Sequence, residues 1–170
     1  MNPKLEEIFA EPGKAYLRPE ELSVFSRFVS SLPERINVYR RLRSDELSLM
    51  QAVADALQQQ FPQESEERLK RSIQNGILIL RCSAMAMLMD NPDFVTKRLE
   101  TWLPETIEIY GTQAINETLY QLIKQQLSQR FTPQQRSLLF PGIDSAKALF
   151  PSHKEGKVPV ATDDTLVSLF

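Results

Sequence analysis

Cysteine and histidine carry the side chains best suited to covalent or metal chemistry, and this chain has one of each, Cys82 and His153. A cysteine acts as a nucleophile or a heme ligand when it is a thiolate, which needs a nearby base or cation. His153 follows in a polar stretch spaced by proline and glycine, where no rigid element would position it as a base. The sequence therefore predicts neither a Cys–His catalytic pair nor a heme, and two such residues cannot form a zinc site.

Cys82 stands in an almost unbroken apolar run, RSIQNGILILRCSAMAMLMD (71–90). Such a run is typical of a core helix, while the small and flexible residues of CSAMAMLM also suit close approach by a partner helix or a planar ligand. From the residues alone, Cys82 is a reactive group, an attachment point for a prosthetic group, or a core side chain. The five glycines form no phosphate-binding pattern, and the acidic cluster at 64–67 indicates a solvated helix start.

Arginines provide the remaining candidate contacts. Arg81 interrupts the apolar run, and it needs a charged partner or a path to solvent because an unpaired buried charge is costly. Another set, in RINVYRRLR, predicts a solvated helix face, with contact to phosphate or to an acidic partner as the alternative. The members of this set are Arg35, Arg40, Arg41 and Arg43.

Length and composition favour one soluble domain. The chain has 170 residues, of which 42% are hydrophobic and 25% charged, and a formal net charge of -2. This balance excludes a general nucleic-acid-coating protein. The longest apolar stretch, 76–89, has about 14 residues and contains Arg81, fewer than the ~20 that span a bilayer, so we expect no membrane insertion. The acidic N-terminus lacks a signal-peptide pattern, and the lone cysteine favours a reducing cytoplasm.

Apolar residues recur at helical spacing through most of the chain, and alternating strand patterns are missing, so the sequence predicts an all-α fold. We expect one domain over residues 1–150 and a flexible tail over 151–170. The expected helices span 3–10, 19–32, 34–43, 44–60, a long helix that begins within FPQESEERLKRS (61–72) and runs through 71–90, two short segments divided near Pro104 within 93–111, 112–131, and a short last helix over 132–140.

Details of the first helices matter for the contacts that follow. Pro33 is expected to limit or kink the helix that starts at Pro19, and Ser44 or Asp45 to cap a new one. The apolar spacing marks a buried face on the 19–32 helix, made of Leu22, Phe25, Phe28 and Val29.

Four elements together resemble the phycobiliproteins, the phycobilisome family that includes allophycocyanin and phycocyanin. The similarity covers roughly residues 1–150 and is continuous from Ile79 to Thr112. It implies a globin-like helical body preceded by an N-terminal helical hairpin. The matching residues are Gly13, Tyr16 and Leu17; Glu34, Arg35, Ile36 and Asn37; Leu80, Arg81, Cys82 and Ala86; and Leu103, Glu105, Thr106, Gly111 and Thr112.

The attachment element of that family is changed in this chain. Phycobiliproteins hold a linear tetrapyrrole, a bilin, through a thioether to the cysteine of a Cys-x-Arg-Asp element, which falls here on Ser72, Gln74 and Asn75. A serine hydroxyl is a far poorer nucleophile than a thiol, and an asparagine supplies no negative charge to the pyrrole nitrogens. The resemblance therefore implies no covalent bilin, and it makes Cys82 the replacement of a buried aromatic residue.

A noncovalent bilin, or another planar ligand, is the alternative that these changes leave open. Ser72, Gln74 and Asn75 would then line the site together with Arg68, because many weak contacts to a large ligand can replace one bond. The connection from Phe61 to Ser72 is shorter than in the family. If it collapses onto the long helix, no room for a ligand remains.

The resemblance also implies a contact surface with another subunit. In the family the arginine equivalent to Arg81 reaches the partner's N-terminal hairpin, which suggests a pair between Arg81 and Glu11; a pair within the chain and exposure to solvent are equal alternatives. The predicted interface residues are Glu7, Glu11, Arg35, Asn37 and Arg81.

These observations predict a phycobilisome-family protein without a covalent chromophore and without enzymatic activity. We expect it to act by contacts with phycobilisome proteins, or with a second copy of itself, in the cytoplasm of a cyanobacterium-like cell. The expected roles are assembly, structure or regulation in light harvesting, and the noncovalent ligand-binding module is the alternative.

Overall fold

The computed structural model describes residues 2–10 and 16–151, and these residues form seven α-helices and no strand. The all-α prediction is confirmed. Glu11, His153 and all but the first residue of the predicted tail lie outside the described residues. The helices are α1 (Pro3–Phe9), α2 (Pro19–Gln60), α3 (Glu66–Met89), α4 (Asp93–Leu99), α5 (Leu103–Ile109), α6 (Gln113–Arg130) and α7 (Pro133–Lys147).

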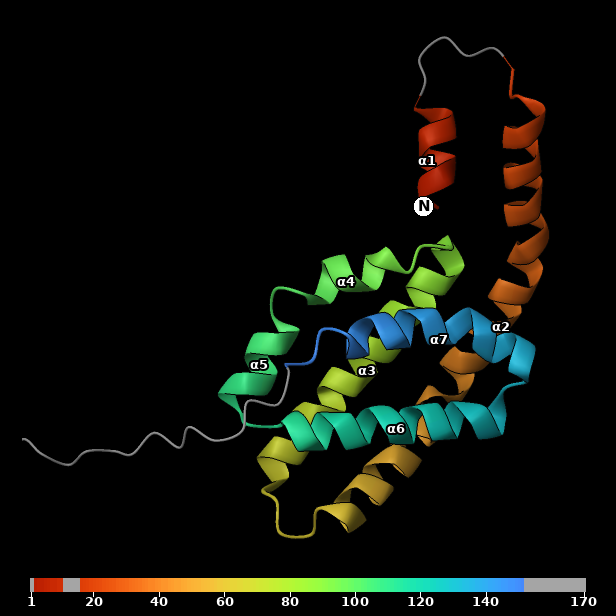
Figure 1. The fold of residues 1–170 in the computed structure, drawn as a ribbon. Coiled ribbons are helices and arrows are strands. Elements are labelled where there is room, and N and C mark those ends of the chain that lie inside the picture. The colour runs from red at the N-terminus through yellow and green to blue at the C-terminus, as the bar shows by residue number, and fades with distance from the viewer. Residues whose placement is uncertain (1, 11–15, 152–170) are drawn as a thin grey trace, which may run out of the picture.

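The long apolar helix α3 lies at the centre of the body, where α2, α6 and α7 pack around it (Figure 1). Its faces contribute to two clusters of buried side chains, one shared with α2, α6 and α7 and one shared with α4, α5 and α7. The helix is long and apolar enough to cross a membrane, and half of that apolar window is buried inside the protein. The apolar composition of α3 is that of a core helix, because other helices pack on several of its sides.

Helix α2 is one continuous helix of 42 residues, so a helix end at Pro33 and the predicted cap at Ser44 or Asp45 are wrong, while the alternative of a kink at Pro33 stays a prediction. Across Ser44 and Asp45 the buried residues Val38, Leu42 and Leu49 keep helical spacing, and this packing outweighs the local signal. Across Pro33 the spacing continues in the half-buried Phe28 and Ser31 and the buried Arg35. Pro33 lies on the exposed side, where two serine hydroxyls of the preceding turn donate to helix carbonyls: Ser30 to Ser26 and Ser31 to Phe28, both at 2.7 Å.

The C-terminal half follows the predicted order with two changes of boundary. The 93–111 segment forms two short helices, as predicted, but they separate at 100–102, and Pro104 lies in the first turn of α5, where its missing N–H costs nothing. Helix α7 starts at the predicted Thr132–Pro133 cap and continues through Pro141 to Lys147, farther than predicted. Gly142 permits this continuation to lie directly against α3, as described below.

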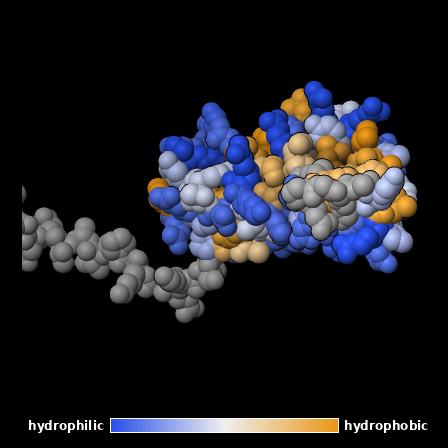
Figure 2. Space-filling model, turned by 90° about the horizontal axis from the view of Figure 1, so that it is seen from above, coloured by the Kyte–Doolittle hydropathy of each residue, from blue (hydrophilic) through white to orange (hydrophobic). Residues whose placement is uncertain are grey.

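Helix α1 and the start of α2 form a hairpin that projects from the body (Figure 1). Leu5 and Ile8 of α1 are buried in it, and the rings of Phe9 and Phe25 meet edge to face at 6.0 Å. The predicted buried face of this part of α2 is wrong for two residues: Leu22 and Val29 are 54% and 43% exposed. Seen from the hairpin end, hydrophobic residues reach the surface among hydrophilic ones (Figure 2).

Candidate functional site

The serine at the expected attachment position is inside the protein. Ser72 on α3 has no exposed surface, and its Oγ accepts a hydrogen bond from Nδ2 of Asn116 on α6 at 3.2 Å. The same Nδ2 donates to the carbonyl and the hydroxyl of Thr112, both at 2.9 Å. This small polar cluster joins the start of α6 to α3.

Asn75 extends the buried polar cluster by one turn of α3. It is 5% exposed, and its Nδ2 has no hydrogen-bond partner among the described residues; Oδ1 of Asn116 has none either. The adjacent Gly76 shows how closely α3 and α6 approach, because a Cβ there would lie 2.9 Å from Cδ2 of Leu119. The two helices therefore meet at van der Waals contact beside Ser72 and Asn75.

Two arginines at the start of α3 hold the corner between α5 and α6. Arg68 donates from Nε to the carbonyl of Tyr110 at 3.1 Å and from Nη2 to the carbonyl of Gly111, and it pairs with Glu64. The guanidinium of Arg71 lies 3.9 Å from the centre of the Tyr110 ring. Gly111 has φ +58°, the left-handed conformation that ends α5 and exposes these carbonyls. The side chains of Arg68 and Arg71 therefore cover this side of α3 and join it to the α5–α6 corner.

The four residues predicted to bind a ligand do not converge on one cavity. Ser72 and Asn75 are buried against α6, and Arg68 holds the α5–α6 corner. Gln74 is exposed and lines a different groove of about 530 Å³ between α3, the end of α2 and the 61–66 segment. Ser72 and Gln74 point in different directions because they lie two positions apart on α3, which corresponds to a rotation of roughly 200° about the helix axis.

The predicted interface residue Arg35 is not on the surface. It is 8% exposed, and it donates to the carbonyl of Met87, to Asp90 Oδ1 at 2.5 Å and to Ser31 Oγ at 2.9 Å. The other carboxylate oxygen of Asp90 accepts from Asn2 Nδ2 at 2.7 Å. Arg35 and Asp90 therefore tie the base of the hairpin to the end of α3, and Arg35 positions the hairpin.

The second arginine of the predicted interface has a partner within the chain. Arg81 is an exposed residue of α3, and its Nη2 lies 2.5 Å from Oε1 of Glu46 on α2. This pair is one of the alternatives open from the sequence; Glu11 lies outside the described residues, so its pair with Arg81 between subunits stays a prediction. Glu7 on α1 and Asn37 on α2 are exposed, as the interface prediction needs.

Cys82 is half-buried and packs against the cluster that α3 shares with α4, α5 and α7. Burial raises the pKa of its thiol, and the nearby charge of Arg98 only partly opposes this effect. A raised pKa keeps the sulfur as a neutral thiol, the opposite of an activated nucleophile. Within the described residues there is also no group of three or more metal-binding side chains.

We predict that iodoacetamide alkylates Cys82 in the folded protein with a pH midpoint above that of the same residue in urea. Because the folded pKa is raised, the contribution of Cys82 to stability is complete below the free-thiol pKa and is lost as the pH rises through the folded pKa. The measurement is mass spectrometry of the alkylated chain over a pH series. Identical profiles in buffer and in urea would contradict the prediction.

Sequence reasoning missed several residues of these networks, among them Asn116, Asp90, Tyr110 and Glu46. Asn116 carried a readable signal, because it stands on the apolar face of α6 beside Ile115 and Leu119 and thus predicts a buried amide. Asp90 and Tyr110 act at helix ends through contacts across the fold, which sequence spacing does not reveal.

Comparison with known families decides the class of this helical body. Residues 10–149 match the family model described as phycobilisome protein. The chain belongs to the phycobilisome protein family. No curated protein matches the chain. The resemblance inferred from the motifs is thereby confirmed, and with it the globin-like all-α class.

Membership in the phycobilisome family supports a protein related to light harvesting. Other proteins of this family are structural and assemble into complexes at the thylakoid surface. Family members normally carry bilins on cysteines. The residues at the expected bilin position do not fit such a group here, because Ser72 is enclosed and bonded to Asn116 and because α6 fills the space beside Gly76.

Proposed function

We propose that this phycobilisome protein carries no covalent bilin and acts through contacts with other phycobilisome proteins or with a second copy of itself. Its role is assembly, structure or regulation in light harvesting, in the cytoplasm of a cyanobacterium-like cell, and it includes no catalysis. The observation that carries the proposal is the buried Ser72, whose hydroxyl accepts from Asn116 at the expected attachment position.

The chemistry at this position supports a pigment-free role. A thioether needs a thiol, and the hydroxyl of Ser72 has no base beside it among its hydrogen-bond partners. Asn75 is neutral, so it lacks the charge that would strengthen hydrogen bonds from a protonated pyrrole. Cys82, whose thiol has a raised pKa, packs against the cluster that α3 shares with α4, α5 and α7, whereas Ser72 lies against α6.

The exposed side of the hairpin supports a role in protein contacts. Leu22, Val29 and Ile36 recur every seven residues along α2, which places them on one side of the helix, and each is more than 40% exposed. Phe9 on α1 is also exposed. A row of exposed aliphatic side chains on a projecting element is typical of a surface that a partner helix covers.

The test is sedimentation velocity of the purified chain alone and mixed with allophycocyanin or phycocyanin. We expect a complex with one of them, or a self-associated species, that weakens about tenfold or more in Val29→Glu, since a charge in an apolar interface is costly. Ile109→Glu is the matched control, because Ile109 is an exposed aliphatic on α5, and it should leave the complex unchanged. A chain that stays monomeric in all three samples contradicts the proposal.

A further inference from the structure

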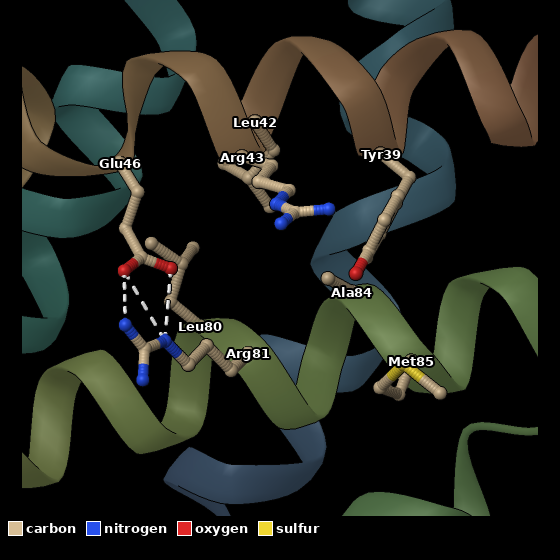
Figure 3. Close-up of a pocket in the computed structure, with 8 residues that line it drawn as sticks. All are labelled: Tyr39, Leu42, Arg43, Glu46, Leu80, Arg81, Ala84 and Met85. Carbon is tan, nitrogen blue, oxygen red and sulfur yellow. Dashed lines mark hydrogen bonds and ion pairs between the residues drawn. The ribbon is translucent and has the colours of Figure 1, made fainter.

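A groove separates α2 from α3 on the side of α3 away from Ser72. It has a volume of about 550 Å³ and lies between two turns of α2 and two of α3 (Figure 3). Leu42, Leu80 and Ala84 form its apolar floor and are almost fully buried, and Met85 borders it with 41% of its surface exposed. The ion pair of Arg81 and Glu46 closes one end of the groove.

Among the described residues, one arginine of the groove makes no ion pair. The guanidinium of Arg43 extends over the groove between Tyr39 and the Arg81–Glu46 pair (Figure 3). Within the described residues Arg43 makes no ion pair, and neither does Arg40 one turn earlier on the exposed side of α2. An occupant should therefore combine carboxylates with apolar side chains.

The chain itself contains such a segment beyond the described residues. Its sequence TDDTLVSLF (162–170) places two acidic residues, Asp163 and Asp164, before three large apolar ones. Leu166, Leu169 and Phe170 follow at i, i+3 and i+4, the spacing with which a helical segment inserts apolar anchors into a groove. No basic residue occurs after Lys157.

Residues 152–162 are long enough to connect Pro151 with a segment bound in the groove. Pro151 accepts a hydrogen bond from Gln113 at the start of α6, beside the α5–α6 corner that Arg68 holds. Leu80 in the groove floor is twelve positions farther along α3 than Arg68, which corresponds to roughly 18 Å. Residues 152–162 span about 36–40 Å when extended, so they can also pass around the helix. Because the segment is part of the same chain, its effective concentration at the groove is higher than that of a separate partner.

We propose that residues 163–170 of this chain dock in the groove between α2 and α3, with Asp163 and Asp164 near Arg43 and with Leu166, Leu169 and Phe170 on the apolar floor. A partner that uses this groove must first displace the segment. The inference is independent of the proposed function, because it requires no partner and no particular state of the bilin position.

Hydrogen–deuterium exchange of the full chain, read by mass spectrometry, tests this docking. In the wild-type protein the amides of 165–170 should exchange at least about tenfold more slowly than an unstructured peptide of the same sequence. Arg43→Glu should remove the protection, and combining it with Asp163→Arg and Asp164→Arg should restore it. Arg27→Glu changes an exposed arginine of α2 outside the groove and should have no effect.

Two outcomes overturn the proposal. One is exchange of 165–170 in the wild-type chain at the rate of the free peptide. The other is protection that increases over a roughly hundredfold range of protein concentration, because docking within one chain is independent of concentration whereas occupation by a second copy is not. Association with phycobiliproteins is measured separately, so failure here leaves the proposed function unaffected.

Discussion

Arg35→Met should lower the free energy of unfolding by about 2–4 kcal/mol, the largest loss expected from a single change at a charged residue of this protein. The side chain of Arg35 is 10% exposed, and its removal takes the guanidinium donors from the Met87 carbonyl and from Asp90 Oδ1. Among the described residues, the carbonyl then keeps only the Asp90 amide, and the carboxylate keeps only Asn2. Asp90 is 40% exposed and regains part of its hydration, which keeps the loss below that of a fully buried pair.

Arg81→Met is the matched control for this prediction. It removes an arginine from another ion pair between α2 and α3, but here the arginine side chain is 62% exposed. An exposed pair contributes about 0–1 kcal/mol, so this variant should unfold close to the wild type. Urea unfolding followed by circular dichroism measures both. Equal losses in the two variants would show that the burial of Arg35 does not determine its contribution.

Gly142→Ala should destabilise the protein by about 1–3 kcal/mol, although alanine normally favours a helix over glycine by about 1 kcal/mol. A Cβ at Gly142 would lie 2.9 Å from Cα of Ser83, a backbone atom of α3 that cannot move away without shifting the helix. The close approach of α7 to α3 depends on this missing methyl group.

Gln134→Ala controls for helix propensity in the same helix, since Gln134 is exposed, and it should change the free energy of unfolding by less than about 0.5 kcal/mol. Thermal and urea unfolding of both variants give the comparison. A Gly142→Ala protein as stable as the wild type, or more stable, would mean that α7 shifts away from Ser83 without loss.

Most of the helical pattern could be predicted from the sequence because each helix repeats its apolar spacing. The errors occurred where local signals did not decide the boundary: Pro33 was expected to limit or kink a helix and the last helix was expected over 132–140, yet α2 continues through Pro33 and α7 continues through Pro141 to Lys147. Leu22 and Val29 were predicted to be buried from the same spacing. Spacing shows that residues share a side of a helix, and only the arrangement of helices shows whether that side is covered.

The candidate site was predictable only in part. The replacement of the attachment cysteine by Ser72 could be derived from the sequence, and the structure adds that this position is enclosed. The partners of Arg35 and Arg81 could not be derived, because Asp90 lies 55 positions from Arg35 and Glu46 lies 35 positions from Arg81. Such pairs depend on the packing of α2 against α3, which sequence spacing does not specify.

The most direct test of a pigment-free phycobilisome protein is to mix the full chain with phycocyanobilin and record absorbance before and after separation on a denaturing gel, with Ser72→Cys as the comparison. Because Ser72 is enclosed between α3 and α6, we expect no saturable red-shifted band from the wild type and no bilin retained on the denatured Ser72→Cys chain. A saturable band lost on denaturation would establish a noncovalent bilin site and contradict the account, and bilin retained by Ser72→Cys would show that the position is open.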